Sequence, residues 1–181
     1  MKVVLINPPY TFWKDGAEPL AALLGHSPPL GLLSVAAYAR EHLAGLTIEG
    51  VDAPAQGLTC DGTARRVLAA APDVVGITIT TTVARNAEAI ALAIRAAHPR
   101  AAIVAGGPHV SGAGSAALPA SNAFDLAVVG EGEETFLDVL RTLRDEAAVR
   151  LPGPRLWDIP GLLTRDARGE VRQTAPRPPI P

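Results

Sequence analysis

The sequence predicts an α/β protein with a flavodoxin-like, doubly wound parallel sheet of five strands. Short apolar runs typical of buried strands alternate with longer segments whose apolar residues recur at helical spacing. Most links between them are short, which favours parallel strands joined by right-handed crossovers. We expect the strand order 2-1-3-4-5 in a three-layer α/β/α arrangement, followed by a C-terminal hairpin and a proline-rich linker.

The first strand is expected at residues 3–6, an apolar run that ends at Asn7-Pro8-Pro9 because proline cannot donate to a sheet. The other strands are expected at residues 46–52, 74–77, 101–105 and 126–129. The 101–105 run carries no charge on either face, as in a parallel strand buried between helices. A long connection, residues 8–29, follows the first strand and contains Phe12 and Trp13; it is expected either to be a surface loop or to face a ligand.

The helices are expected at residues 29–42, 61–71 and 133–146, with another that includes residues 87–94. Pro29 suits a first helical turn, where its missing N–H needs no partner. Pro72 ends the second helix, because the residue before a proline is disfavoured in helical geometry. A segment rich in Gly, Ala and Ser follows the fourth strand.

The composition changes near Leu151, and we expect residues 1–150 to form one domain and residues 151–181 a hairpin with a linker. Seven of the 17 prolines lie between Pro152 and Pro181. Residues 161–165 and 170–174 are expected to pair around Asp166-Ala167-Arg168-Gly169. Residues 175–181 are typical of an extended, polyproline-like linker, and such a linker suggests a further domain.

The overall charge and the cysteine count exclude several classes of protein. The formal net charge is -2, so nucleic acid is not an expected partner. Cys60 is the single cysteine, which excludes an internal disulfide and a cluster held by thiolates of this chain alone. No apolar run approaches the roughly 20 residues that a membrane helix needs, and the N-terminus lacks the apolar core of a signal peptide. A cytoplasmic protein without a membrane partner is expected.

The candidate site lies at the carboxyl ends of the first, third and fourth strands, where open α/β sheets bind ligands. The residues just beyond these ends are expected to converge: Asn7, Pro8, Pro9, Thr78, Thr80, Thr81, Thr82, Gly106, Gly107 and Pro108. The threonine hydroxyls offer donors and acceptors, although threonine is also an ordinary strand residue.

Gly106 and Gly107 indicate a close approach of a ligand to the backbone. We expect a valine at either position to block the ligand and to leave the sheet folded. No G-x-G-x-x-G follows the first strand, and no P-loop is present. Glu133 and Glu134 suit the N-terminus of the last helix and would repel a phosphate there. A bulky, mostly neutral ligand is therefore favoured over a triphosphate.

Five ordered motifs resemble one family: INPP at 6–9, PPLGLLSVAAYARE at 28–41, DVVGIT at 73–78, GGPHVS at 106–111 and VVGEGEETF at 128–136. They are similar to the cobalamin-binding domain at the N-terminus of cobalamin-dependent radical S-adenosylmethionine enzymes, which are class B methyltransferase-like. The similarity covers nearly the whole chain.

The resemblance implies a role for several of these positions. Thr78 and Thr82 match positions that line the slot for the nucleotide tail of cobalamin, and Gly106 and Gly107 match the glycines that admit it. Gly130 and Glu131 match a loop near the same rim. The corrin ring would then lie across the strand ends, with its upper face toward a partner domain.

The resemblance also implies a parent enzyme longer than this chain. Such an enzyme holds a [4Fe-4S] cluster with three closely spaced cysteines and uses S-adenosylmethionine, whereas this chain has only Cys60. The cluster and S-adenosylmethionine are therefore expected in a missing radical domain, present in cis or in trans. The parent enzyme is expected to be a radical methyltransferase or a related enzyme, which transfers a methyl group from methylcobalamin to an unactivated carbon; some relatives catalyse cyclisations or rearrangements.

The sequence departs from many cobalamin domains after the first strand. These carry Asp-x-His-x-x-Gly, whose His binds cobalt from below, whereas Asn7-Pro8-Pro9-Tyr10 stands at that place here. His26 is preceded by Leu24 rather than an aspartate two positions earlier, so we expect no protein ligand to the metal. A structural or rim hydrogen bond is expected for His109. His42 and His98 are expected at helix ends, where the dipole favours them.

One alternative is a related domain that has lost cobalamin and serves as an interaction or docking module. Flavodoxin-like and receiver-like domains are a second alternative, but a receiver needs an acidic cluster at the first strand's end, where Ile6-Asn7-Pro8 stands. A hydrolase is disfavoured because no G-x-S-x-G elbow exists.

Overall fold

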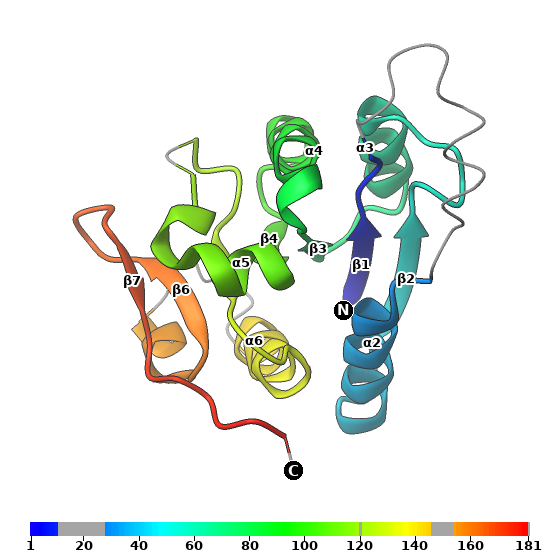
Figure 1. Ribbon diagram of the computed structural model, residues 1–181. Coiled ribbons are helices and arrows are strands. Elements are labelled where there is room, and N and C mark those ends of the chain that lie inside the picture. The colour runs from blue at the N-terminus through cyan, green and yellow to red at the C-terminus, as the bar shows by residue number, and fades with distance from the viewer. Residues whose placement is uncertain (11–27, 120, 146–153, 181) are drawn as a thin grey trace.

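The computed structural model describes residues 1–10, 28–119, 121–145 and 154–180 (Figure 1). Its strands are β1 (Lys2–Asn7), β2 (Thr47–Asp52), β3 (Val74–Thr78), β4 (Ala102–Gly106), β5 (Leu126–Val128), β6 (Leu162–Arg165) and β7 (Val171–Gln173). Its α-helices are α2 (Leu30–His42), α3 (Cys60–Ala69), α4 (Ala84–Ala97), α5 (Pro108–Ala113) and α6 (Glu133–Asp145). Short 3-10 turns cover Thr81–Val83, Gly114–Ala117 and Pro154–Asp158.

The strands form one sheet in the order β2-β1-β3-β4-β5-β6-β7. The five strands from β1 to β5 pair in parallel, which confirms the predicted order 2-1-3-4-5. The predicted hairpin is present as β6 and β7, and it extends the sheet by pairing antiparallel with β5. Within the described residues the sheet therefore has seven strands rather than five. The three helices with predicted ends lie within one or two residues of them, and α4 contains the expected residues 87–94. The segment rich in Gly, Ala and Ser contains α5 and a 3-10 turn.

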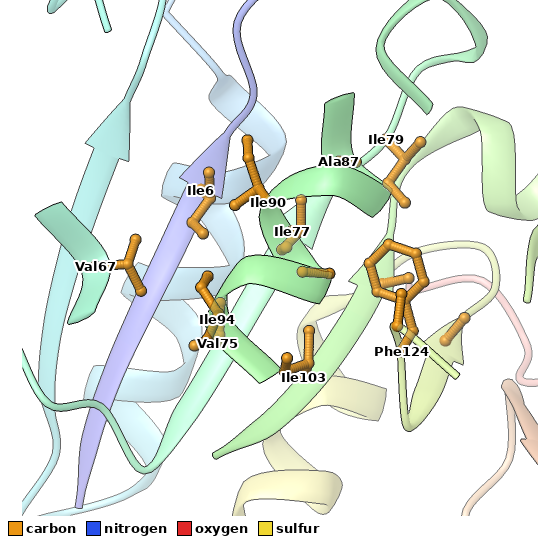
Figure 2. Close-up of a cluster of buried hydrophobic side chains, with 14 of the residues drawn as sticks. Ile6, Val67, Val75, Ile77, Ile79, Ala87, Ile90, Ile94, Ile103 and Phe124 are labelled. Carbon is orange, nitrogen blue, oxygen red and sulfur yellow. The ribbon is translucent and has the colours of Figure 1, made fainter. Parts of the chain in front are cut away.

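Alternate residues of the parallel strands form two buried clusters, one on each face of the sheet. Helices α3 and α4 pack together on one face, whereas α2 and α6 pack together on the other (Figure 1). Figure 2 shows the first cluster, in which Ile6 and Ile77 of the sheet meet Ile90 and Ile94 of α4. This arrangement is the predicted α/β/α architecture.

After β3 the chain leaves the sheet before it reaches Thr80, Thr81 and Thr82. The last ladder-like bond is donated by the Ile79 N–H to the Gly106 carbonyl at 2.8 Å. Thr80 is extended and precedes the 3-10 turn at Thr81–Val83, in which Val83 is buried. The turn runs directly into α4, so the threonine hydroxyls lie at the start of a helix.

A tight turn closes the β6–β7 hairpin. Asp166 Oδ1 accepts hydrogen bonds from the Arg168 and Glu170 N–H groups, at 2.8 and 3.0 Å. Gly169 has a φ of 81°, which favours glycine. The Arg172 guanidinium donates to Asp166 and holds the pKa of that carboxyl below its usual range. Of the predicted turn residues, Gly169 thus acts through its backbone conformation and Asp166 through the hydrogen bonds of its carboxylate.

Candidate ligand-binding site

A cavity of about 550 Å³ opens at the carboxyl ends of the parallel strands. It lies on the face of the sheet that α2 and α6 cover, because its apolar walls include Leu5, Val104 and Phe136 of that core. Leu5 of β1, Gly76 of β3 and Val104 of β4 stand in one row across the sheet. All three residues line the cavity.

Eight of the twelve candidate residues line this cavity: Asn7, Thr78, Thr80, Gly106, Gly107, Pro108, Gly130 and Glu131. Pro8, Pro9, Thr81 and Thr82 are not among the lining residues. The structure therefore brings together the ends of β1, β3 and β4 with the loop before α6, as predicted for parallel strands.

Three of the four other candidates make hydrogen bonds near the ends of β1 and β3, and of these only Thr82 bonds to a residue that lines the cavity. Thr82 Oγ1 shares one with Thr80 Oγ1 at 2.9 Å. Thr81 Oγ1 lies 3.2 Å from His109 Nδ1, which is the rim hydrogen bond expected for that histidine. The Pro9 carbonyl accepts from Nδ2 of the buried Asn86 at 2.7 Å, so α4 fixes the chain that leaves β1.

Gly106 and Gly107 differ in their surroundings. A Cβ added at Gly106 would meet no atom within 4 Å, so the cavity space reaches the backbone at the end of β4. A Cβ added at Gly107, where φ is 95°, would lie 2.7 Å from Thr78 Oγ1 and 2.9 Å from the Ile79 nitrogen. The expectation that a valine at either glycine leaves the sheet folded is therefore corrected for Gly107, which packs against backbone.

The mouth of the cavity combines polar groups with exposed apolar side chains. Asn7 Nδ2 donates to Asp52 Oδ1 at 2.9 Å, and Ser111 Oγ accepts from the Gly130 N–H at 2.9 Å. Tyr10 and Leu30 line the mouth, with exposed fractions of 53% and 70%. The site is thus an apolar slot with hydrogen-bonding groups around its entrance.

The sequence did not single out the walls of the cavity. The walls that were missed are contributed by Leu5, Leu32, Val35, Gly76, Val104, Val128 and Phe136. The sequence did indicate one of these walls at Gly76, because a glycine within an apolar strand marks a place where another group approaches the backbone closely. An added Cβ there would lie 2.6 Å from Leu5 Cδ2, so Gly76 makes room for a neighbouring side chain.

His42 and His98 each contact a backbone carbonyl. His42 Nδ1 lies 2.9 Å from the Tyr38 carbonyl, and His98 Nε2 lies 3.0 Å from the Pro72 carbonyl. Within the described ranges, no group of three His, Cys, Asp or Glu residues could hold a metal ion. Phe12, Trp13 and His26 lie outside the described residues. No helix in the described part of the chain has the length and hydropathy to cross a bilayer.

The fold and the cavity define a class of protein: a doubly wound α/β domain that binds a ligand at the carboxyl edge of its sheet. Comparison with known families makes the class specific. The family model described as "B12 binding domain" matches residues 19–140, and the chain belongs to this family.

One curated relative is a protein of Pyrococcus horikoshii that is named an uncharacterized methyltransferase. It is 32% identical to this chain over 180 residues, which are 99% of this chain and 36% of the relative. The chain therefore spans about a third of that relative's length.

The described residues fit the nucleotide tail of a B12 cofactor. A flat, largely apolar base suits a slot walled by aliphatic and aromatic side chains, and the backbone at Gly106 is open to that slot. Thr78 and Thr80 place hydroxyls at the entrance, where polar parts of the cofactor could find partners.

Proposed function

We propose that this chain is the cobalamin-binding module of a radical S-adenosylmethionine enzyme that methylates an unactivated carbon. The observation that carries the proposal is the slot beneath Gly106, in a chain of the B12-binding family. Two further points support it. The motifs resemble this class of enzyme, and a relative of which this chain covers 36% is named a methyltransferase.

The residues of the cavity would share the binding. Gly106 and the walls at Leu5, Val104 and Phe136 would receive the nucleotide tail, with Gly107 and Thr78 shaping the entry to the slot. Asn7, Thr80, Pro108, Gly130 and Glu131 would contact the polar periphery of the cofactor. Pro9, Thr81 and Thr82 would act from behind these groups, through the hydrogen bonds described above, and Pro8 would act through its place in the chain that leaves β1.

A bound cobalamin would supply the methyl group, because the difficult chemistry belongs to the cofactor. The protein's share is to orient it and to exclude water from its buried part. S-adenosylmethionine and a [4Fe-4S] cluster would belong to another domain, since this chain has one cysteine. We further propose that residues 1–150 are the binding domain and residues 151–181 the connection toward that domain.

The Asp-x-His-x-x-Gly motif is absent from the sequence, and no histidine of the described residues lines the cavity, so we expect no protein ligand to the metal. The visible spectrum of the bound cofactor reports this directly. A spectrum without histidine coordination is expected, and a spectrum of histidine coordination would contradict the assignment.

The binding test uses purified protein mixed with hydroxocobalamin, desalted, and examined by visible absorption. Gly106→Val is expected to abolish retention, because Gly106 lines the cavity and its added side chain begins at a Cβ with no atom of the fold within 4 Å. Gly50→Val is the matched control: Gly50 also lies in a strand, is exposed, and has no atom within 4 Å of an added Cβ. Equal retention by the two variants would refute this location of the site.

A second candidate function is a cobalamin-free interaction module. The observation that favours it is the pair of exposed apolar side chains at the cavity, Tyr10 and Leu30, together with Leu33 of α2, which is 54% exposed. Wild-type protein that stays colourless after mixing with hydroxocobalamin, while folded by circular dichroism, would favour this alternative.

A further inference from the structure

The C-terminal arm, residues 174–180, lies against α6 after the hairpin (Figure 1). Five of its seven residues are exposed, and only Thr174 and Arg177 are half-buried. The arm therefore gains little from apolar burial, and its position depends on polar contacts.

Arg177 is the main attachment of the arm. Its Nη1 donates to Glu134 Oε2 at 2.8 Å, and its Nη2 donates to Asp138 Oδ2. The Arg177 side chain is only 15% exposed, whereas the Glu134 and Asp138 side chains are 39% and 33% exposed, so this fork on two carboxylates of one helix face is partly shielded from solvent. A partly shielded, forked arrangement of this kind is stronger than an isolated pair of surface charges.

The arm is also attached on each side of Arg177. The Ala175 carbonyl accepts from the Gly161 N–H at 2.8 Å. The Ile180 N–H donates to Glu131 Oε2 at 2.7 Å. From Ala175 to Ile180 the arm thus runs along α6 toward the loop that precedes the helix.

Both of these outer contacts lead to the wall of the cavity. Gly161, which binds the arm through its N–H, accepts from the Val129 N–H through its carbonyl at 2.8 Å. Glu131, which binds Ile180, lines the cavity together with Gly130 and Gly132. We call residues 129–132 the cavity loop. The arm contacts this loop directly at Glu131, and through Gly161 it is linked to Val129.

We propose that Arg177 is a positioning residue that straps the arm onto α6 and thereby fixes the cavity loop in the shape that retains the ligand. The part that concerns retention rests on the proposed cobalamin-binding function. The attachment of the arm to α6 by Arg177, which we call the strap, does not rest on that function, because it is present in the protein without ligand.

The test compares Arg177→Met with Arg172→Met. Arg172 also contacts two carboxylates, Asp166 and Glu170, but these belong to the hairpin turn rather than to α6. Each variant therefore loses one arginine that contacts two carboxylates, but only Arg177→Met removes a contact between the arm and α6. Glu134→Gln, on the helix side, serves as a second variant that leaves the arm's sequence intact.

The first readout is the exchange of the Ile180 amide, followed by NMR. Pro178 and Pro179 have no N–H, so Ile180 carries the reporter for the end of the arm. Arg177→Met is expected to raise its exchange rate about tenfold and to shift the Gly130 and Glu131 amide resonances, whereas Arg172→Met changes neither. Unchanged Ile180 exchange in Arg177→Met would overturn the strap.

The second readout is the dissociation constant for hydroxocobalamin from equilibrium dialysis. Arg177→Met is expected to weaken binding about fivefold or more, and Glu134→Gln less, while Arg172→Met binds as the wild type does. A released arm with unchanged affinity would overturn the link to the cavity but not the proposed function. If the wild type itself fails to bind, the proposed function fails, and the Gly130 and Glu131 resonances still decide whether the strap fixes the loop.

Discussion

Replacing Gly107 with alanine tests the claim that this glycine supports the fold itself. Its φ of 95° and ψ of -179° lie in a region that side chains other than glycine's rarely adopt. Holding alanine there costs about 1–3 kcal/mol. The added Cβ would also lie 2.9 Å from both the nitrogen and the oxygen of Ile79, and this overpacking adds about 1–3 kcal/mol.

The Ile79 backbone has little freedom to move away. Its N–H donates to the Gly106 carbonyl, and its carbonyl accepts from the His109 N–H at 2.9 Å. We therefore expect Gly107→Ala to lower the free energy of unfolding by about 3 kcal/mol or more. For a chain of this size, that loss lowers the melting temperature by about 6–12 °C.

Thermal unfolding followed by far-ultraviolet circular dichroism measures this effect. Gly112→Ala is the control, because Gly112 lies in α5 and an added Cβ there meets no atom within 4 Å. Its melting temperature is expected to stay the same or to rise slightly, since alanine favours helix. A Gly107→Ala variant that melts within about 2 °C of the wild type would refute the reasoning.

Three other substitutions test local features of the fold. Asn86→Ala removes the bond to the Pro9 carbonyl and leaves that buried acceptor unpaired, so urea unfolding should show a loss of about 1–3 kcal/mol. Thr59→Ala removes the cap of α3, in which Thr59 Oγ1 accepts from the Gly62 N–H. Urea unfolding should show a loss of about 1 kcal/mol in the free energy of unfolding, and no loss would mean that the cap is dispensable. Asp166→Asn should speed exchange of the Arg168 and Glu170 amides at neutral pH. Arg172 lowers the folded-state pKa of Asp166, so the stabilisation that the Asp166 carboxylate contributes is present above about pH 4. This stabilisation is lost as the pH falls through the lowered pKa, and the exchange rates of wild type and variant should converge there.

The strand order and the place of the cavity could be predicted because both depend on local patterns. Apolar runs such as residues 101–105 form buried parallel strands, and the geometry of parallel sheets then fixes the edge where their carboxyl ends meet. The hairpin followed from its turn residues in the same way. That it extends the sheet depended on β5 having a free edge, which no local pattern reveals.

The difference between Gly106 and Gly107 could not be read from the sequence. The two residues are adjacent and identical, and only the path of the chain after β3 brings Ile79 against the second of them. The contacts of Arg177 were hidden for a similar reason. Its partners are 43 and 39 residues away in the sequence, and the fold of the hairpin decides which carboxylates it meets.

Glycines line much of the cavity on the α2 and α6 face. Six are among its lining residues: Gly31, Gly76, Gly106, Gly107, Gly130 and Gly132. At Gly31, Gly106 and Gly130 an added Cβ would meet no atom within 4 Å, so the missing side chains leave space there, whereas neighbouring atoms already occupy the space at Gly76 and Gly107.

The same glycines indicate how deep a ligand can reach. Added Cβ atoms at Gly31 and Gly106 would meet nothing within 4 Å, so the entrance between the start of α2 and the end of β4 is open. At Gly76 the added atom would collide with Leu5 and approach Phe136, so the inner end is already filled. A flat group would therefore enter past Gly106 and stop at the row of Leu5, Gly76 and Val104. Leu5→Ala should deepen the cavity at this row and lower the free energy of unfolding by about 2–5 kcal/mol. Gly106→Val should close the entrance and leave the free energy of unfolding nearly unchanged.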